Sequence, residues 1–331
     1  MGANYETGVS YELEARATLC ATSEPAVYHA LASLTVLRGV FDQYGGSFPH
    51  KIPAVSPAVQ HGLQEYENAI KSLVVRLSNR NALSIHYSLL CCQMFMSIEL
   101  AMDDFTSCTQ HFIRGIRIMH QGRSRPYLGS NGNVMAAQLV GMPALDAFAI
   151  KLFLTPCPDG LTEDFLIPDD EAQNRVIAPL STERAAILHA NMHLADLGRS
   201  TLNLLDNVSR LSPESQAETV STLASNRINI LHGLQAWKDD FVAIAQLEIS
   251  QDTSWARLGT TFSIFFNTVL RSIVTLAFRS LEVEGESVEL VFNEMLEVAY
   301  RLGQLKKEVN GVSERQLEGI DEQAFRYDLF L

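Results

Sequence analysis

The chain has 331 residues, of which 47% are hydrophobic and 19% charged. A chain this long and apolar can bury a sizeable core, which excludes an intrinsically disordered protein. The formal net charge of −13 argues against a protein that binds nucleic acid by itself, since such proteins gather basic residues against the phosphates. The densest basic run is short and contains Arg114, Arg117, Arg123 and Arg125.

Five cysteines are spread along the chain: Cys20, Cys91, Cys92, Cys108 and Cys157. Their odd number and the lack of CxxC spacing argue against a disulfide framework. We expect all five to be reduced, in a cytosolic or nuclear compartment. Residues 1–16 are polar and acidic and show no apolar stretch of the kind that a secretory signal needs.

Helical periodicity dominates from residue 27 onward. Apolar side chains recur every three or four positions, as on one face of a helix, over residues 27–44, 59–77, 83–102, 105–119 and 288–302. We find no alternating apolar and polar runs bounded by hairpin turns, the pattern typical of strands. The sequence therefore predicts an all-α fold, a multi-helix antiparallel array packed around a continuous core.

Start and stop residues agree with several of these helices. Ser56–Pro57 and Ser212–Pro213 each place a capping hydroxyl before a proline suited to the first helical position. Asp104 is expected to cap the helix that follows it, because its carboxylate accepts hydrogen bonds from unpaired backbone N–H groups. Gly122 is expected to end that helix.

One long loop is expected to divide the chain. Residues 155–180 are rich in proline and acidic residues, and they separate an N-terminal helical half, 1–154, from a C-terminal helical half, 181–331. We expect the two halves to form one continuous domain. A milder break is expected at 281–287.

The segment 259–278 is apolar and nearly long enough to span a bilayer. Arg271 and Asn267 lie near its middle, and a central arginine costs about 2.5–3.5 kcal/mol on insertion. We therefore predict a buried core helix rather than a membrane span.

Histidine and cysteine spacings suggest metal ligands in two places. His189 and His193 lie four residues apart on one face of a predicted helix, as zinc ligands would. However, Ala190 stands where a metalloprotease helix carries glutamate, and no third ligand can be assigned. Cys108 and His111 lie three residues apart. We interpret the first pair as exposed or core histidines, and the second as a packed cysteine beside a surface histidine.

Two aspartate pairs, Asp103–Asp104 and Asp169–Asp170, resemble the magnesium-binding pairs of all-α terpene synthases. The third carboxylate expected one turn later is replaced in this chain, by Ser107 after the first pair and by Gln173 after the second. We interpret the pairs as a helix cap and a solvated loop.

No phosphate-binding loop, GxGxxG or GxSxG motif is present in the sequence. Trp237 and Trp255 are expected to anchor the core or its rim. The sequence thus predicts no catalytic, cofactor-binding or metal-binding residue and no cofactor, so we do not expect an enzyme.

Four segments resemble parts of a known family. They are 25–41; 63–73, which contains Tyr66; 89–119, with Glu99, Asp103–Asp104, His111 and Gly115; and 322–331. Their order and spacing resemble the long helical region of fungal binuclear-zinc-cluster transcription factors, over most of 25–331. Several features of the chain depart from that family. The six-cysteine cluster that bridges two zinc ions is absent, and Ala101 lies in a turn where glycine is common.

The resemblance implies a nuclear, transcription-regulator-like protein without its own DNA-binding zinc cluster, with a cytoplasmic location as the alternative. It would influence metabolic or secondary-metabolite genes through protein or small-molecule contacts. The expected partners are a second copy of the chain, a zinc-cluster regulator or a small-molecule effector. Neither nucleic acid nor a membrane is expected as a direct partner.

Two further interpretations stay open. The chain is alternatively an all-α enzyme or a ligand-binding protein with a pocket between helices, because a fold does not dictate a function. The loop at 155–179 would then be a lid. The chain also ends at Leu331, where the family usually continues, so we expect a shortened or truncated relative, and the third interpretation is a non-functional fragment.

Overall fold

The structure, a computed structural model, describes residues 9–43, 56–78, 81–129, 132–154, 182–248, 254–278 and 285–309. Within these ranges the chain forms ten helices and one two-stranded antiparallel sheet: α1 (Val9–Thr22), α2 (Pro25–Gln43), α3 (Pro57–Leu77), α4 (Ala82–Ala101), α5 (Phe105–Gln121), β1 (Tyr127–Leu128), β2 (Val134–Met135), α6 (Leu145–Leu154), α7 (Thr182–Ser209), α8 (Ala217–Glu248), α9 (Ser254–Leu276) and α10 (Gly285–Val309). The predicted all-α fold is confirmed.

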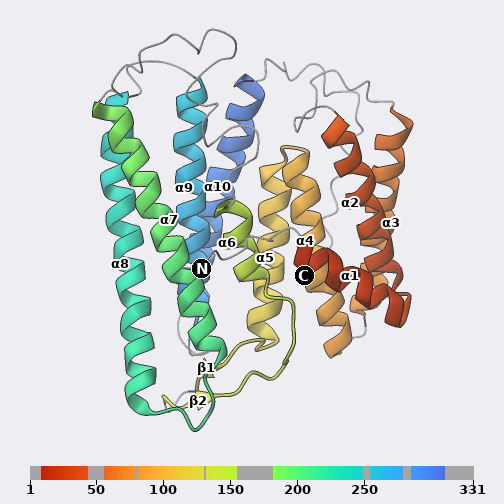
Figure 1. Cartoon of the computed structure of the whole chain (residues 1–331), viewed down its shortest axis with the longest axis horizontal. Coiled ribbons are helices and arrows are strands. Elements are labelled where there is room, and N and C mark those ends of the chain that lie inside the picture. Colours follow the sequence, from red (N-terminus) through yellow and green to blue (C-terminus); the bar gives the residue numbers. More distant parts are fainter. Residues whose placement is uncertain are drawn as a thin grey trace, which may run out of the picture.

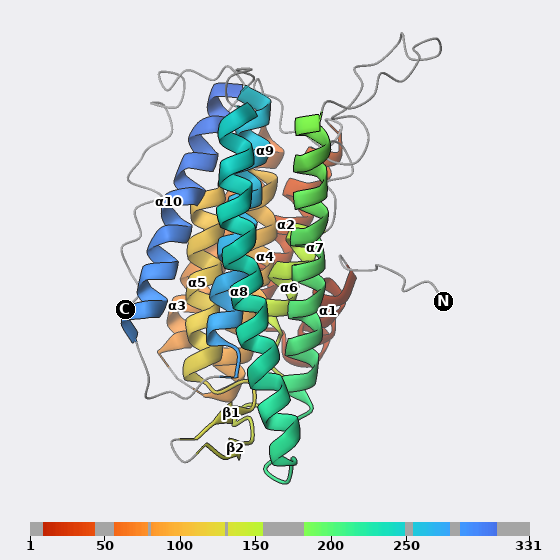
Figure 2. The same cartoon turned by 90° about the vertical axis from the view of Figure 1, so that its left-hand side faces the viewer.

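Most of the long helices stand side by side, and helices adjacent in sequence pack as pairs (Figure 1). The pairs are α2 with α3, α4 with α5, α7 with α8, and α9 with α10. Contacts of α2 with α4, α5 with α10 and α8 with α9 join the pairs into one array. The β1–β2 hairpin lies at one end of this array (Figure 2).

Helix α4 connects two parts of the core. One cluster of buried side chains includes Leu89, Cys92 and Met96 of α4 and extends through α5 to α10. The other includes Leu90 and Phe95 of α4 and extends to α1, α2 and α3. Because α4 buries side chains around most of its circumference, the two clusters meet along this one helix.

This burial also explains the hydropathy of α4. Within the described residues, α4 is the one helix long and apolar enough to cross a membrane by length and composition, and most of it is buried inside the fold. Core helices of this kind satisfy the same criteria as membrane spans. The segment predicted as a core helix from its sequence, 259–278, falls mostly in α9, where Phe265, Val269 and Leu270 are buried.

The predicted helix boundaries hold in part. Asp104 caps α5, since Ser107 N–H donates to its Oδ1 at 2.9 Å, and α5 ends at Gln121, directly before Gly122. Pro57 begins α3, although the Ser56 side chain makes no capping hydrogen bond.

The prediction at Ser212–Pro213 was wrong. Helix α8 begins only at Ala217, and Ser212 N–H instead donates to Ser215 Oγ at 2.9 Å, inside a turn. Serine followed by proline also starts a type I turn, and here this preference prevails.

Two other predictions need correction. The β1–β2 pair, with Tyr127 opposite Met135, was missed because strands of two residues are too short to show an alternating pattern. Part of the break predicted at 281–287 is helical, since α10 begins at Gly285. The loop predicted at 155–180 lies outside the described residues.

Candidate functional site

Three buried polar side chains from three helices meet between α3, α4 and α5. Tyr66 of α3 donates its hydroxyl hydrogen to Glu99 Oε1 of α4. His111 Nε2 of α5 lies 2.9 Å from the same hydroxyl and 3.9 Å from Glu99 Oε1. We refer to these three residues as the polar centre. Each belongs to a segment that carries the family resemblance, although Tyr66 is 33 residues from Glu99 and 45 residues from His111 in the chain.

Burial holds the polar centre uncharged. Burial raises the pKa of Glu99 from 4.5 to about 8, an effect that the Tyr66 hydrogen bond opposes and nearby Asp104 increases. Burial, with a smaller effect from the positive charge of Arg114, lowers the pKa of His111 from 6.5 to about 3. Near neutral pH the carboxyl group is therefore mostly protonated and the imidazole is neutral.

The hydrogen bonds to Tyr66 are compatible with this neutral state, in which Glu99 Oε2 carries the carboxyl proton. Neutral His111 donates Nε2–H to the Tyr66 oxygen, a tautomer inferred from the network, while Tyr66 donates to Glu99. Glu99 Oε2 has no hydrogen-bond partner in the described part of the chain. The side chain of Glu99 is 1% exposed, so a substrate has no route to it. The polar centre can link three helices, but it offers no accessible acid or nucleophile.

The structure corrects the interpretation of His111. The sequence predicted a packed cysteine beside a surface histidine, and Cys108 is indeed buried. The His111 side chain, however, is only 12% exposed and its ring packs against Phe95 at 5.0 Å between centroids. The partner that draws it inward, Tyr66, lies 45 residues away, and helical periodicity carries no information on such a contact.

The other candidate residues that the structure describes do not form a reactive centre. His189 and His193 are exposed on α7, and between them the Ala190 carbonyl accepts a hydrogen bond from Trp237 Nε1 at 2.7 Å. Among the residues that the structure describes, no group of three or more His, Cys, Asp or Glu could hold a metal ion. Trp237 is a core residue, as predicted.

Some predicted residues cannot be placed. Cys157 and Asp169–Asp170 lie outside the described residues, and so does segment 322–331 of the family resemblance. The side chain of Trp255 is likewise outside them. Asp103 lies in the turn between α4 and α5, with its Oδ1 3.6 Å from Lys306 Nζ of α10.

The basic run does not form a continuous surface. Arg117 pairs with Glu289 of α10, with 2.6 Å between Nη2 and Oε2. Arg125 makes two hydrogen bonds of 2.6 Å to the carboxylate of Asp146. Two of the four arginines are thus neutralised by carboxylates.

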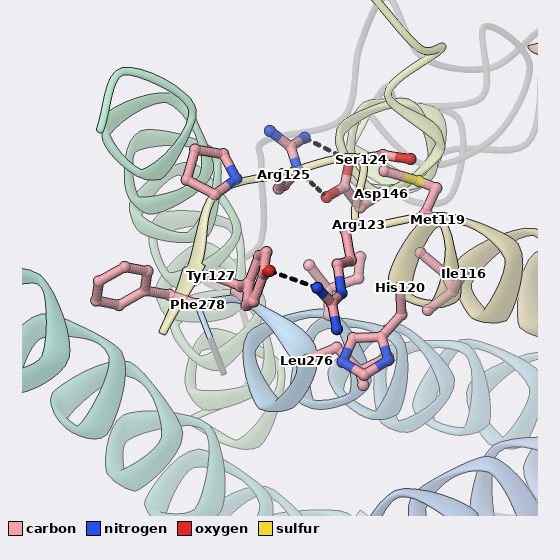
Figure 3. A pocket seen from close by; sticks show the side chains of 13 residues that line it. Ile116, Met119, His120, Arg123, Ser124, Arg125, Tyr127, Asp146, Leu276 and Phe278 are labelled. Atoms are coloured by element: carbon pink, nitrogen blue, oxygen red, sulfur yellow. Dashed lines mark hydrogen bonds and ion pairs between the residues drawn. The ribbon is translucent and has the colours of Figure 1, made fainter. Parts of the chain in front are cut away.

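A small pocket lies where the ends of α5 and α9 meet the chain leading into β1 (Figure 3). Arg123, Tyr127 and the Arg125–Asp146 pair contribute its polar groups, and α9 contributes apolar side chains. The sequence singled out the arginines only as a basic run. Their convergence with Asp146 depends on how α6 packs, which no local pattern reveals.

Comparison with known proteins gives one informative similarity. Over 287 residues, 83% of this chain and 67% of the relative, the sequence is 29% identical to a protein named transcription regulator lscL from Purpureocillium lilacinum. The chain is thus similar to a fungal transcription regulator. No family model matches it, and no solved structure matches it either.

Proposed function

We propose that this protein regulates transcription in the nucleus and acts through protein or small-molecule contacts rather than through a reacting centre. The observation that carries the proposal is the similarity to a protein named a transcription regulator, which spans 83% of the chain. A similarity this long covers most of the chain rather than one short motif.

The packing supports the proposal. The segments that resemble the zinc-cluster factors contain the three residues of the polar centre, so the resemblance coincides with a tertiary contact of this fold. A scaffold of paired helices with a buried, uncharged centre suits a role in binding other molecules. We include membership of the zinc-cluster family in the proposal.

The proposal also covers targets and partners. We infer that the regulated genes are metabolic or secondary-metabolite genes. Because the chain has an acidic net charge of −13 and two of its clustered arginines are paired with carboxylates, we infer that a zinc-cluster partner, rather than direct DNA contact, brings it to promoters. A second copy of this chain is the other protein partner that we propose.

Transcript sequencing in the encoding organism tests the proposal. We expect deletion of the gene to change a coherent set of metabolic transcripts, and the intact gene, reintroduced elsewhere in the genome, to restore them. If the protein is instead an enzyme, deletion should change metabolites and leave transcripts unchanged. Unchanged transcripts after deletion, under conditions in which the gene is expressed, contradict the proposed function.

A further inference from the structure

The pocket in Figure 3 lies between two helix ends. Met119 and the chain that follows α5 form one side, and Ile273, Leu276 and Phe278 at the end of α9 form the other. We refer to it as the α5–α9 pocket. About 60 Å³ of it is open to the centres of water-sized molecules, which leaves room for several water molecules or a carboxylate with a short carbon chain.

Two residues beyond the end of each helix lies a residue with a strained backbone conformation. Arg123 has φ 49° and Phe278 has φ 55°, in the left-handed region that costs an L-residue about 1–2 kcal/mol and that glycine usually occupies at a helix end. Two hydrogen bonds fix Arg123 there: its N–H donates to His120 O at 3.1 Å, and Ser124 N–H donates to Met119 O at 3.0 Å.

The glycine of this turn, Gly122, stands one residue too early to relieve the strain, since its φ is −76°. The chain therefore places an arginine where glycine would be more stable. Strained residues tend to gather at binding sites, because the side chain they present is needed there. Of the four non-glycine residues with positive φ in the described chain, two, Arg123 and Phe278, line this pocket.

The guanidinium of Arg123 gives the pocket a positive charge. Its Nη1 donates to the Tyr127 hydroxyl at 2.5 Å, and it lies over the Tyr127 ring at 4.6 Å from the centroid. Within the described chain Arg123 forms no ion pair, whereas Arg125 beside it is neutralised by Asp146. Figure 3 shows the Arg123 guanidinium between the Tyr127 hydroxyl and the His120 ring.

The pocket contains a second polar group, and this one has no hydrogen-bond partner among the described residues. The hydroxyl oxygen of Ser124 is buried and makes no hydrogen bond within the described residues. A buried hydroxyl without a partner costs about 1–3 kcal/mol, so such groups usually serve a ligand or a bound water molecule. Ser124 adjoins Arg123, and both line the pocket.

We propose that the α5–α9 pocket binds a small organic carboxylate, which acts as the effector of the regulator. One arginine matches the two oxygens and single charge of a carboxylate, and the apolar side chains of Met119, Ile273 and Leu276 suit a short carbon chain. Phosphate would bring up to two negative charges and no apolar part, so this pocket fits it less well. The effector role rests on the proposed function.

Calorimetric titration of the full chain with butyrate and with inorganic phosphate tests the binding site. We expect saturable butyrate binding and at least tenfold weaker phosphate binding. Arg123→Gly should weaken butyrate binding at least tenfold while the chain stays folded, since glycine suits this backbone position. Arg199→Gln, which removes an exposed charge on α7, is the matched control and should bind butyrate like the wild type.

Three results would overturn the carboxylate site. They are no saturable binding of butyrate, equal butyrate binding by wild type and Arg123→Gly, and tighter binding of phosphate than of butyrate. The thermal midpoint of each variant is measured alongside. If Arg123→Gly unfolds, Arg123→Asn replaces it, because asparagine also tolerates the left-handed region.

The effector role is tested by complementing the deletion strain with Arg123→Gly. We expect the strain to lose the transcript response to added butyrate that the wild-type gene restores. If deletion changes transcripts but Arg123→Gly complements fully, the effector role fails and the proposed function stands. If butyrate binds in vitro but deletion changes no transcript, the proposed function fails and the carboxylate site stands.

Discussion

The hydroxyl of Tyr66 has two buried hydrogen-bond partners. It donates to Glu99 and lies within hydrogen-bond distance of His111, and burial raises the pKa of the phenol well above its ordinary value. Because Glu99 and His111 are nearly closed to solvent, neither can exchange this hydroxyl for bulk water.

We predict that Tyr66→Phe lowers the free energy of unfolding by about 2 kcal/mol. The substitution keeps the ring against Phe95 but leaves two buried polar groups without their partner. Urea unfolding at pH 6 measures the change. Tyr300→Phe removes a hydroxyl from a side chain that is 59% exposed, and should change stability by less than about 0.5 kcal/mol. An equal effect of the two substitutions would contradict this account.

The structural role of a single residue could be predicted where it depends only on neighbouring residues in the sequence. The cap at Asp104 depends on one side chain and the backbone three residues later, so its sequence context suffices. The polar centre joins residues 33 and 45 positions apart. The family resemblance named Glu99 and His111 without saying that they meet, and periodicity alone placed His111 at the surface.

At the scale of the helices, Gly115 sets how closely α5 approaches its neighbours. A Cβ atom at this position would lie 2.0 Å from Leu145 Cδ2 of α6 and 3.5 Å from Cys92 Cβ of α4. Leu145 is itself fully buried, so its side chain has little room to move. The family resemblance includes both His111 and Gly115, and each has a physical role here. His111 belongs to the polar centre, and Gly115 permits the close packing of α5 against α6 and α4.

We predict opposite effects for two glycine-to-alanine substitutions. Gly115→Ala should lower the free energy of unfolding by about 1–3 kcal/mol, because overpacking a buried contact outweighs the gain in helix propensity. Gly303→Ala in α10, where a Cβ would meet no atom within 4 Å, should raise it by about 0.5–1 kcal/mol. Thermal and urea unfolding of both variants give the comparison. Stabilisation by Gly115→Ala would contradict this prediction, because it would mean that the Leu145 side chain can move aside at little cost.

The helices themselves were largely predictable, because a buried face repeats every three or four residues over many turns. The predicted runs at 59–77 and 105–119 match α3 and α5 within two residues at either end. Shorter sequence patterns were less informative. The Ser212–Pro213 pair was predicted to start a helix but forms a turn, and the β1–β2 hairpin was missed because each strand has only two residues. Which helices pair, and hence where the α5–α9 pocket lies, depends on tertiary packing.

At the scale of the whole molecule, the polar centre makes stability depend on pH. Glu99 has a pKa of about 8 in the folded chain and 4.5 as its ordinary value. The folded chain therefore holds one more proton than the unfolded chain between these values, and stability falls as pH rises through that window. His111 has a pKa of about 3 when folded and 6.5 ordinarily, so its contribution falls as pH drops from 6.5 toward 3.

The two contributions cancel between pH 4.5 and 6.5, where one excess proton on Glu99 offsets one missing from His111. We predict that the centre contributes a plateau of stability over this range, with losses on both sides. The alkaline loss belongs to Glu99 alone, since His111 is neutral in both states above pH 6.5. Over its full window the Glu99 shift corresponds to roughly 5 kcal/mol, at about 1.4 kcal/mol for each pKa unit.

Glu99→Gln isolates this effect from the other titrating groups. The amide keeps an acceptor for Tyr66 and cannot ionise, so the stability of the variant relative to wild type should rise steadily between pH 5 and 8. Urea unfolding of both proteins at half-unit intervals gives the difference directly. A difference that stays constant over this range would mean that the Glu99 carboxyl group is ionised in the folded chain, and that the linked helices hold a buried charge rather than a proton.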